Sequence, residues 1–183
     1  MTWRVEPLSA QNLAAYLDLF DNRAFSNTPQ WSGCYCQFYL GEPGTAASSP
    51  DQAPTNRQAA CDRLAAGTFG GYLAFDSDKA VGWCAAGPAN QYKLLPPDAS
   101  DKARIPCFVI DPEYRGRGVA TSLLIFAIDD LRNKGFTKVQ AAPAAQSDSQ
   151  EGNYHGPKAM YLKAGFQEGP LMPNGQQIVE LEL

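Results

Sequence analysis

The sequence predicts an α+β (mixed α/β) fold, and its 183 residues fit one domain spanning 1–183. Strand-like and helix-like stretches follow one another in the order β-α-α-β-β-β-α-β-α-β. Within that order, a short apolar run enters a loop and then a long amphipathic helix, which predicts a strand–loop–helix crossover over 105–134. Hydrophobic residues make up 44% of the chain and charged residues 19%, a balance that excludes disordered and fibrous classes.

The N-terminal part predicts one strand and two helices. Residues 3–8 alternate loosely between apolar and polar types, as a strand does. Ser9 is a candidate N-cap for a helix whose apolar residues recur at helical spacing, namely Leu13, Tyr16, Leu17 and Phe20. A second helix is expected from Thr55 or Asn56 to Ala66, where Gly67 ends it.

The rest of the chain predicts five strands and two helices. Further strands are expected at 71–75 and 80–86, which form a hairpin, and at 105–110, 136–142 and 178–183. The clearest helix has one apolar face, made of Val119, Ala120, Leu123, Leu124, Ala127, Ile128 and Leu131. Gly135 follows this helix as a stop, and a short helix is expected between Pro157 and Gly165.

Composition excludes several classes of function. Lys and Arg number 15 against 19 for Asp and Glu, so the net charge of −4 argues against a nucleic-acid partner. The single histidine, His155, excludes a multi-histidine metal centre, and no metal is expected. No apolar stretch is long enough to cross a membrane, and the first residues do not resemble a signal peptide. Five cysteines, an odd number, favour reduced thiols and a cytoplasmic location.

The segment around 108–121 carries the chemical signal. A buried strand leads into Arg115-Gly116-Arg117-Gly118, which opens the long helix. Free amides and the positive end of the helix dipole meet there, so the loop predicts a phosphate or pyrophosphate site. The Gly-Lys-Ser/Thr ending of nucleotide triphosphatases and the third glycine of dinucleotide-binding folds are both missing. The structural alternative is a tight turn with surface arginines.

Two motifs resemble the GNAT superfamily of N-acetyltransferases. Residues 115–120, Arg-Gly-Arg-Gly-Val-Ala, are similar to its acetyl-CoA signature, and 159–166, Ala-Met-Tyr-Leu-Lys-Ala-Gly-Phe, are similar to its C-terminal helix and turn. The resemblance implies a central, mostly antiparallel sheet of six to seven strands, splayed at the fourth and fifth strands and flanked by about four helices. It further implies an acetyl-CoA-binding core over 105–168 and acceptor-side loops over about 25–56.

The resemblance also assigns the residues that would bind acetyl-CoA as co-substrate. The strand 108–110 would pair with the pantetheine arm, the glycine loop at 115–120 would hold the pyrophosphate, and Asn153 would touch the pantetheine. These residues are Phe108, Val109, Ile110, Arg115, Gly116, Arg117, Gly118, Val119, Ala120, Thr121 and Asn153. Pro143, in the following strand, would interrupt pairing where the strands splay.

For catalysis, the resemblance assigns Tyr161 as the general acid that protonates the leaving thiolate. A core aromatic is the plainer interpretation of Tyr161. Some family members carry a glutamate base early in the fourth strand, but Arg104 occupies the matching position. A water chain, an acid from another strand or His155 would have to act as the base instead. His155 titrates near neutrality and lies just before the Tyr161 helix, although a loop or capping histidine is its plainer interpretation.

An aromatic segment precedes the proline-rich loop and belongs to the acceptor side. Trp31, Tyr35 and Tyr39, with Phe38, form either a pocket wall or part of the core. Cys34 and Cys36 are interpreted as packing or pocket-lining residues, with a redox pair and a metal site as weaker alternatives.

The sequence thus predicts an N-acetyltransferase that moves an acetyl group from acetyl-CoA to a primary amine by direct attack in a ternary complex. A small or antibiotic-like amine is slightly favoured over a protein acceptor, and the chain is expected to be a monomer or homodimer. The alternatives are a non-catalytic acyl-CoA-binding module and, more remotely, a cysteine-based redox or metal protein.

Overall fold

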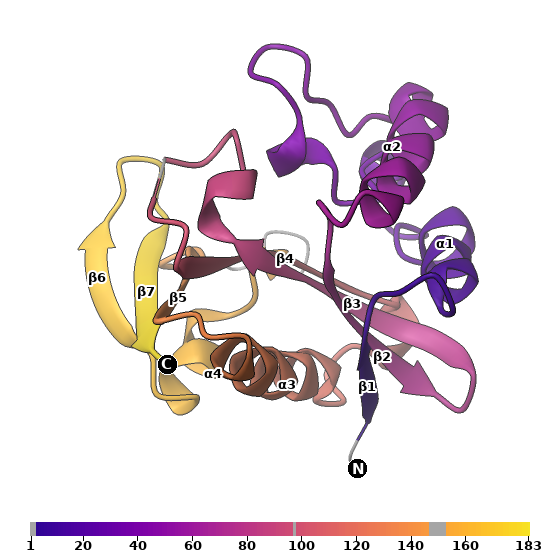
Figure 1. Ribbon diagram of the computed structural model, residues 1–183. Helices are drawn as coiled ribbons and strands as arrows, with labels where there is room; N and C mark the ends of the chain where they lie inside the picture. Colours follow the sequence, from indigo (N-terminus) through magenta and orange to yellow (C-terminus); the bar gives the residue numbers. More distant parts are fainter. Residues whose placement is uncertain (1–2, 97, 147–152) are drawn as a thin grey trace.

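A computed structural model describes residues 3–96, 98–146 and 153–183 and contains one seven-stranded sheet (Figure 1). Its spatial order is β1-β2-β3-β4-β5-β7-β6. Every neighbouring pair is antiparallel except β4 and β5, which run parallel. The predicted mostly antiparallel sheet is confirmed. The strands are β1 (Arg4–Pro7), β2 (Gly71–Asp76), β3 (Lys79–Pro88), β4 (Lys102–Ile110), β5 (Lys138–Ala141), β6 (Gln167–Leu171) and β7 (Gln177–Glu182).

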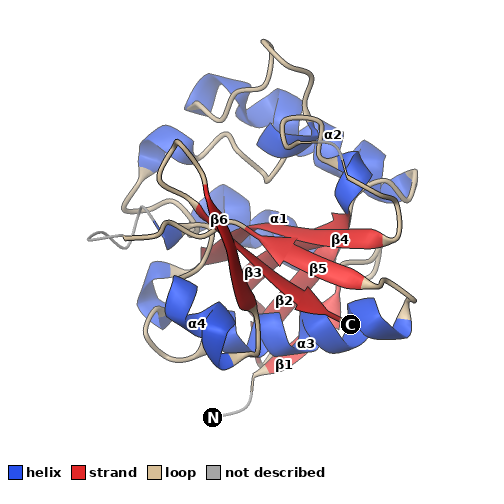
Figure 2. Cartoon of the chain, turned by 90° about the vertical axis from the view of Figure 1, so that its left-hand side faces the viewer, coloured by secondary structure: helices blue, strands red, loops and turns tan. Residues whose placement is uncertain are grey.

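Helices cover both faces of the sheet (Figures 1 and 2). The α-helices of the described residues are α1 (Leu13–Asn22), α2 (Ala53–Ala65), α3 (Val119–Asn133) and α4 (Lys158–Lys163). One core lies between the sheet and α3 with α4, and the other lies between the sheet and α1 with α2. Short 3-10 turns join these elements at Pro29–Trp31, Phe38–Leu40, Pro50–Gln52, Ala89–Gln91 and Pro112–Tyr114.

The two middle strands, β4 and β5, separate halfway along β4. They pair only from Lys102 with Lys138 to Ile105 with Ala141, although β4 continues to Ile110. Pro106 follows the last pair and has no N–H with which to extend the ladder. The expected splay is therefore present, and it leaves one edge of residues 106–110 without a partner strand.

Alternation along β4 sends its side chains to the two cores in turn. Phe108 packs in the core under α3, whereas Cys107 and Val109 belong to the core on the α1 side. On the α1 side, the divergence is therefore lined by Cys107 and Val109.

Several local expectations need correction. Ser9 does not cap α1, because α1 begins at Leu13 and the Asn12 side chain accepts a hydrogen bond from the Ser9 amide instead (2.8 Å). Asn56 does not begin α2, which starts at Ala53 after a proline turn. The Asn56 amide instead donates to the carbonyls of Gly33 and Ala47 and ties the preceding loop to the helix.

Strand β6 was not predicted, and strands β3 and β4 are longer than their apolar runs. The antiparallel pairing of β3 with β4 extends to Pro88 and Ala103, past a bulge between Ala85 and Gly87. Among the described helices, none is long and apolar enough to cross a membrane.

Candidate active site

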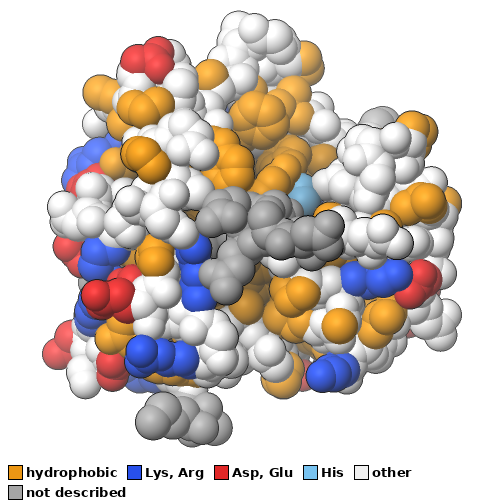
Figure 3. All heavy atoms as spheres, turned by 180° about the vertical axis from the view of Figure 1, so that it is seen from behind, with side chains coloured by type: hydrophobic (Ala, Val, Ile, Leu, Met, Phe, Trp, Pro, Cys, Tyr) orange, Lys and Arg blue, Asp and Glu red, His pale blue; other side chains and the backbone are white. Residues whose placement is uncertain are grey.

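One cavity of about 660 Å³ opens where β4 and β5 diverge. Figure 3 shows hydrophobic side chains gathered around this hollow. At one end lies the loop that enters α3, including Arg115, Gly116 and Gly118. At the other end lie residues from the segment between α1 and α2, including Trp31 and Tyr39. The cavity therefore joins two regions that are far apart in the sequence.

The glycine loop presents backbone amides to the cavity. Gly116 and Gly118 have φ values of 72° and 81°, a left-handed conformation that other residues adopt at a cost. A Cβ built on either glycine would meet no atom within 4 Å, so it would project into open space. The first α3 bond to the loop is Ser122 N–H to the Gly118 carbonyl, and the preceding amides lie in the unpaired first turn of the 15-residue helix. These features fit a pyrophosphate.

Asp111 fixes the start of this loop. Its carboxylate is buried and accepts hydrogen bonds from the Glu113 amide (3.1 Å) and the Arg23 guanidinium (2.9 Å). The Lys79 ammonium lies 3.3 Å away. Burial acts to raise the pKa of Asp111, but the hydrogen bonds from Arg23, the Glu113 amide and Lys79 outweigh it and hold the pKa below its ordinary value. Asp111 thereby joins the loop to α1 and to the β2–β3 hairpin.

The two arginines of the loop differ in placement. The Arg115 side chain lines the cavity and donates to the Ile110 carbonyl (3.3 Å) and the Asn27 side chain (3.3 Å). The Arg117 guanidinium lies over the Tyr114 ring, 5.3 Å from its centroid, and is not part of the lining. Of the two, Arg115 is placed to face a bound phosphate.

The open edge of β4 is partly used by the chain itself. The Phe108 amide donates to the Tyr154 carbonyl (2.6 Å). Tyr154 follows the segment 147–152, which lies outside the described residues. Asn153, Tyr154, Gly156 and Pro157 then line the cavity opposite β4.

His155 is buried beside the cavity and is not among its lining residues. Its Nδ1 lies 2.7 Å from the Pro106 carbonyl, and because a carbonyl only accepts, Nδ1 carries the proton. Its Nε2 accepts from the Gln176 amide (2.6 Å) and lies 3.4 Å from the Tyr39 hydroxyl. Burial lowers the pKa of His155 to about 4, against the opposing effect of the Pro106 hydrogen bond. The imidazole is therefore neutral near pH 7.

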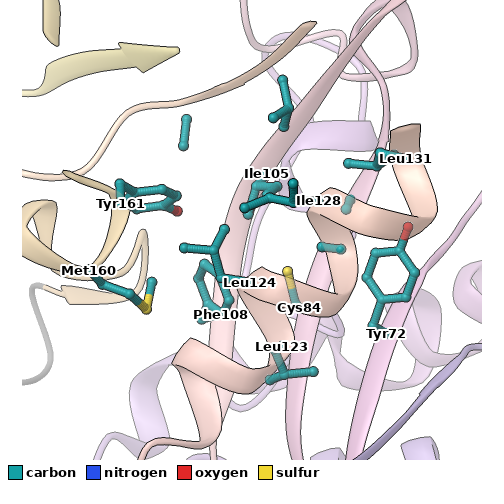
Figure 4. Close-up of a cluster of buried hydrophobic side chains, with 14 of the residues drawn as sticks. Tyr72, Cys84, Ile105, Phe108, Leu123, Leu124, Ile128, Leu131, Met160 and Tyr161 are labelled. Atoms are coloured by element: carbon teal, nitrogen blue, oxygen red, sulfur yellow. The ribbon is translucent and has the colours of Figure 1, made fainter. Parts of the chain in front are cut away.

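Tyr161 is fully buried on α4 and faces the core under α3 (Figure 4). Its ring packs against Phe108 and Phe166, and its hydroxyl donates to the His155 carbonyl (2.6 Å). Burial raises the pKa of Tyr161 well above its ordinary value, so the phenol is protonated. Its neighbour Met160 lines the cavity, whereas Tyr161 lies one layer behind the wall.

The end of the cavity away from the glycine loop is aromatic. Trp31 and Tyr154 pack edge to face with centroids 6.0 Å apart, and Phe38 and Tyr39 pack likewise at 5.3 Å. The hydroxyls of Tyr39 and Tyr154 lie 3.5 Å apart. These contacts connect the segment after α1 to the loop before α4. Phe25 completes the aromatic lining.

Three thiols lie in the same wall. Cys34, Cys36 and Cys107 line the cavity, and the sulfurs of Cys36 and Cys107 are 3.5 Å apart. All five cysteines of the chain are free. Among the described residues, no group of three or more His, Cys, Asp or Glu side chains is arranged to hold a metal ion.

The Cys34–Cys36 turn has a strained backbone. Tyr35 and Cys36 have φ values of 41° and 49°, and such left-handed residues cost about 1–2 kcal/mol each. The Tyr16 hydroxyl donates to the Tyr35 carbonyl (2.8 Å), and the Trp83 indole donates to the Cys36 sulfur (3.1 Å). These buried hydrogen bonds hold the turn so that both thiols face the cavity.

Most residues predicted for the site line the cavity, and four do not. Tyr35 stacks on Phe20 in the core, and the side chains of Arg117, His155 and Tyr161 also lie outside the lining. Those that line it are Trp31, Tyr39, Phe108, Val109, Ile110, Arg115, Gly116, Gly118, Val119, Ala120, Thr121 and Asn153. Sequence reasoning missed Phe25, Thr28, Tyr154 and Cys107, since no motif marks them.

Solved structures share this fold across nearly the whole chain. An N-acetyltransferase from Staphylococcus aureus covers 100% of this chain and 99% of its own, with a TM-score of 0.61 and 17% identity. The PaiA N-acetyltransferase from Thermoplasma acidophilum, solved in complex with coenzyme A, covers 100% of both chains at a TM-score of 0.56 and 16% identity. A phosphinothricin acetyltransferase from Sinorhizobium meliloti, solved in complex with AcCoA, covers 100% of this chain and 89% of its own, with a TM-score of 0.62 and 17% identity.

The sequence itself matches the model of the acetyltransferase (GNAT) family over residues 34–166. Curated proteins give no match. The family model spans more than half of the chain, including the glycine loop and the β4–β5 divergence. This chain therefore belongs to the GNAT family of acetyltransferases and is an acyltransferase.

Proposed function

We propose that this enzyme transfers the acetyl group of acetyl-CoA to a primary amine by direct attack in a ternary complex. The observation that carries the proposal is one continuous cavity from the glycine loop, past the edge of β4 that lacks a partner strand, to an aromatic wall. Such a cavity can hold a phosphate-bearing thioester and an acceptor end to end. The free thiols also favour a reducing, cytoplasmic setting.

In this proposal, the backbone of 115–120 and the Thr121 hydroxyl hold the pyrophosphate, and Arg115 adds its charge. The main chain of 108–110 pairs with the pantetheine arm beside Asn153, and for this pairing the Phe108 amide gives up its hydrogen bond to the Tyr154 carbonyl. Acetyl-CoA supplies an acetyl group activated as a thioester. An amide of β4 polarises the thioester carbonyl, as an oxyanion donor does.

The amine attacks as the neutral species, a C–N bond forms, and the C–S bond breaks. The Tyr161 phenol gives its proton to the departing thiolate and is reprotonated by the proton that the amine loses. To reach the sulfur, the Tyr161 hydroxyl gives up its contact with the His155 carbonyl. His155 acts as a positioning residue, because its weakly basic Nε2 is already bonded by Gln176 while Nδ1 holds the Pro106 carbonyl.

A screen for CoA release across amine classes tests the proposal. At least one class should release free CoA, and Tyr161→Phe should lower kcat about 100-fold while leaving the calorimetric Kd for acetyl-CoA unchanged. Full turnover by Tyr161→Phe across the pH range would remove Tyr161 from the acid role. Tight acetyl-CoA binding without turnover of any amine would instead identify an acyl-CoA-binding module.

A further inference from the structure

The acceptor end of the cavity has a chemistry of its own. Five aromatic side chains and three thiols face it from the segment after α1, from β4 and from the loop before α4. These are Phe25, Trp31, Cys34, Cys36, Phe38, Tyr39, Cys107 and Tyr154. Aromatic faces and sulfur atoms favour apolar, planar or polarisable groups over strongly hydrated ones.

Three side chains of this wall, Cys34, Cys36 and Tyr39, have raised pKa values and therefore carry no negative charge near neutral pH. A hydrogen bond with Cys36 and burial raise the pKa of Cys34, and burial raises the pKa of Cys36. Burial likewise raises the pKa of Tyr39. Titratable groups facing the cavity from the other elements are Cys107 on β4, Tyr114 and Arg115 in the loop, and Tyr154. Among the described lining residues, Arg115 is the charged one, and it is a cation.

This wall is built before an acceptor arrives. Trp31 meets Tyr154 edge to face, and Cys36 is held by the Trp83 indole in a left-handed turn. A preformed apolar wall disfavours a bound ammonium, because desolvation opposes the charged form of an amine. A second charge on the acceptor would meet the same opposition.

From this wall we propose that the acceptor is a primary amine on an aromatic, otherwise uncharged body, and that it binds from solution as the free base. The inference rests on the proposed function and narrows it to a substrate class. The aromatic body packs between Trp31 and Tyr39, and the amine points toward the thioester along β4. Proton removal then takes place in bulk water.

A matched substrate series tests the class. With acetyl-CoA saturating, phenethylamine should exceed both phenylalanine, which adds a carboxylate to the same skeleton, and butane-1,4-diamine by at least about 30-fold in kcat/KM. Higher kcat/KM for phenylalanine or the diamine would overturn the inference while leaving acetyl transfer intact. Absence of turnover with every amine would instead refute the proposed function.

The pH profile tests entry as the free base. The kcat/KM for phenethylamine should rise with pH up to the pKa of the amine itself. Its β,β-difluoro analogue has nearly the same shape and a much less basic amine, so its profile should break at a correspondingly lower pH. A break at the same pH for both amines would show that a group on the enzyme removes the proton, and would overturn this part.

Variants of Trp31 test whether the acceptor binds against this aromatic wall. Trp31→Ala should raise the KM for phenethylamine about tenfold, and Trp31→Phe should restore most of the affinity. Neither should change the Kd for acetyl-CoA. Ile125→Ala, on the exposed outer side of α3, is the matched control and should change neither constant. An unchanged KM in Trp31→Ala would mean that the acceptor does not bind against Trp31.

Discussion

Replacing Asp111 tests whether one buried carboxylate holds the glycine loop to the rest of the fold. Its side chain is 3% exposed, and the partners Arg23 and Lys79 are 19% and 38% exposed. Removing one partner of a buried ion pair costs about 3–5 kcal/mol. Since Arg23 is partly hydrated and also contacts Asp18, the lower end of about 3 kcal/mol is expected for Asp111→Ala. For a chain of this size, that is a fall in Tm of about 6–12 °C.

Thermal unfolding followed by circular dichroism measures the effect, with Asp78→Ala as control for an exposed carboxylate of the same hairpin region. Asp111→Asn separates charge from capping, because the amide oxygen can still accept from Glu113. The folded-state pKa of Asp111 is lowered, so its contribution is present above the unfolded pKa of about 3.9 and is lost as pH falls through the folded value. Equal Tm changes for Asp111→Ala and Asp78→Ala would refute the reasoning.

Three further predictions follow from other positions. Gly118→Ala should raise the calorimetric Kd for acetyl-CoA at least about tenfold, because a Cβ enters the anion site, whereas Gly175→Ala, with the same φ of 81° and equally open surroundings, should not. In the wild type, the unfolded histidine binds a proton below pH 6.5, whereas the folded His155, with a pKa of about 4, stays neutral, so the free energy of unfolding should fall by about 3 kcal/mol between pH 6.5 and 4. Urea titrations of His155→Gln should lack this fall. Gly82→Ala should cost about 1–3 kcal/mol in the same titrations at pH 7, because its Cβ would lie 2.6 Å from the Val119 side chain.

Sequence reasoning predicted the glycine loop and α3 because their signals are local. The strand, the two glycines and the apolar face of α3 occupy one continuous stretch, and the structure brings them together in that order. Strand β6 escaped prediction because 167–171 is exposed throughout and includes Gly169 and Pro170, so no alternation marks it.

Only some of the residues in the aromatic wall of the cavity could be predicted from the sequence. Tyr35 and Tyr39 lie four positions apart in one aromatic segment, yet Tyr35 packs in the core and Tyr39 faces the cavity. The left-handed turn at 35–36 gives the two side chains different directions. Tyr and Cys rarely adopt this conformation, so the sequence does not indicate the turn. Tyr154 reaches Trp31 across 123 positions of sequence through loop packing that no local pattern encodes.

Pro106 has a consequence for how quickly the enzyme can accept a ligand. If β5 paired with β4 along its full length, backbone hydrogen bonds, each worth about 1 kcal/mol, would have to break before a ligand could enter between the two strands. Pro106, at the first position beyond the last β4–β5 pair, lacks the N–H donor that such continued pairing would need. The gap between these strands is thus built into the covalent chain, and a ligand that pairs with β4 displaces the Phe108–Tyr154 hydrogen bond rather than a whole β-ladder.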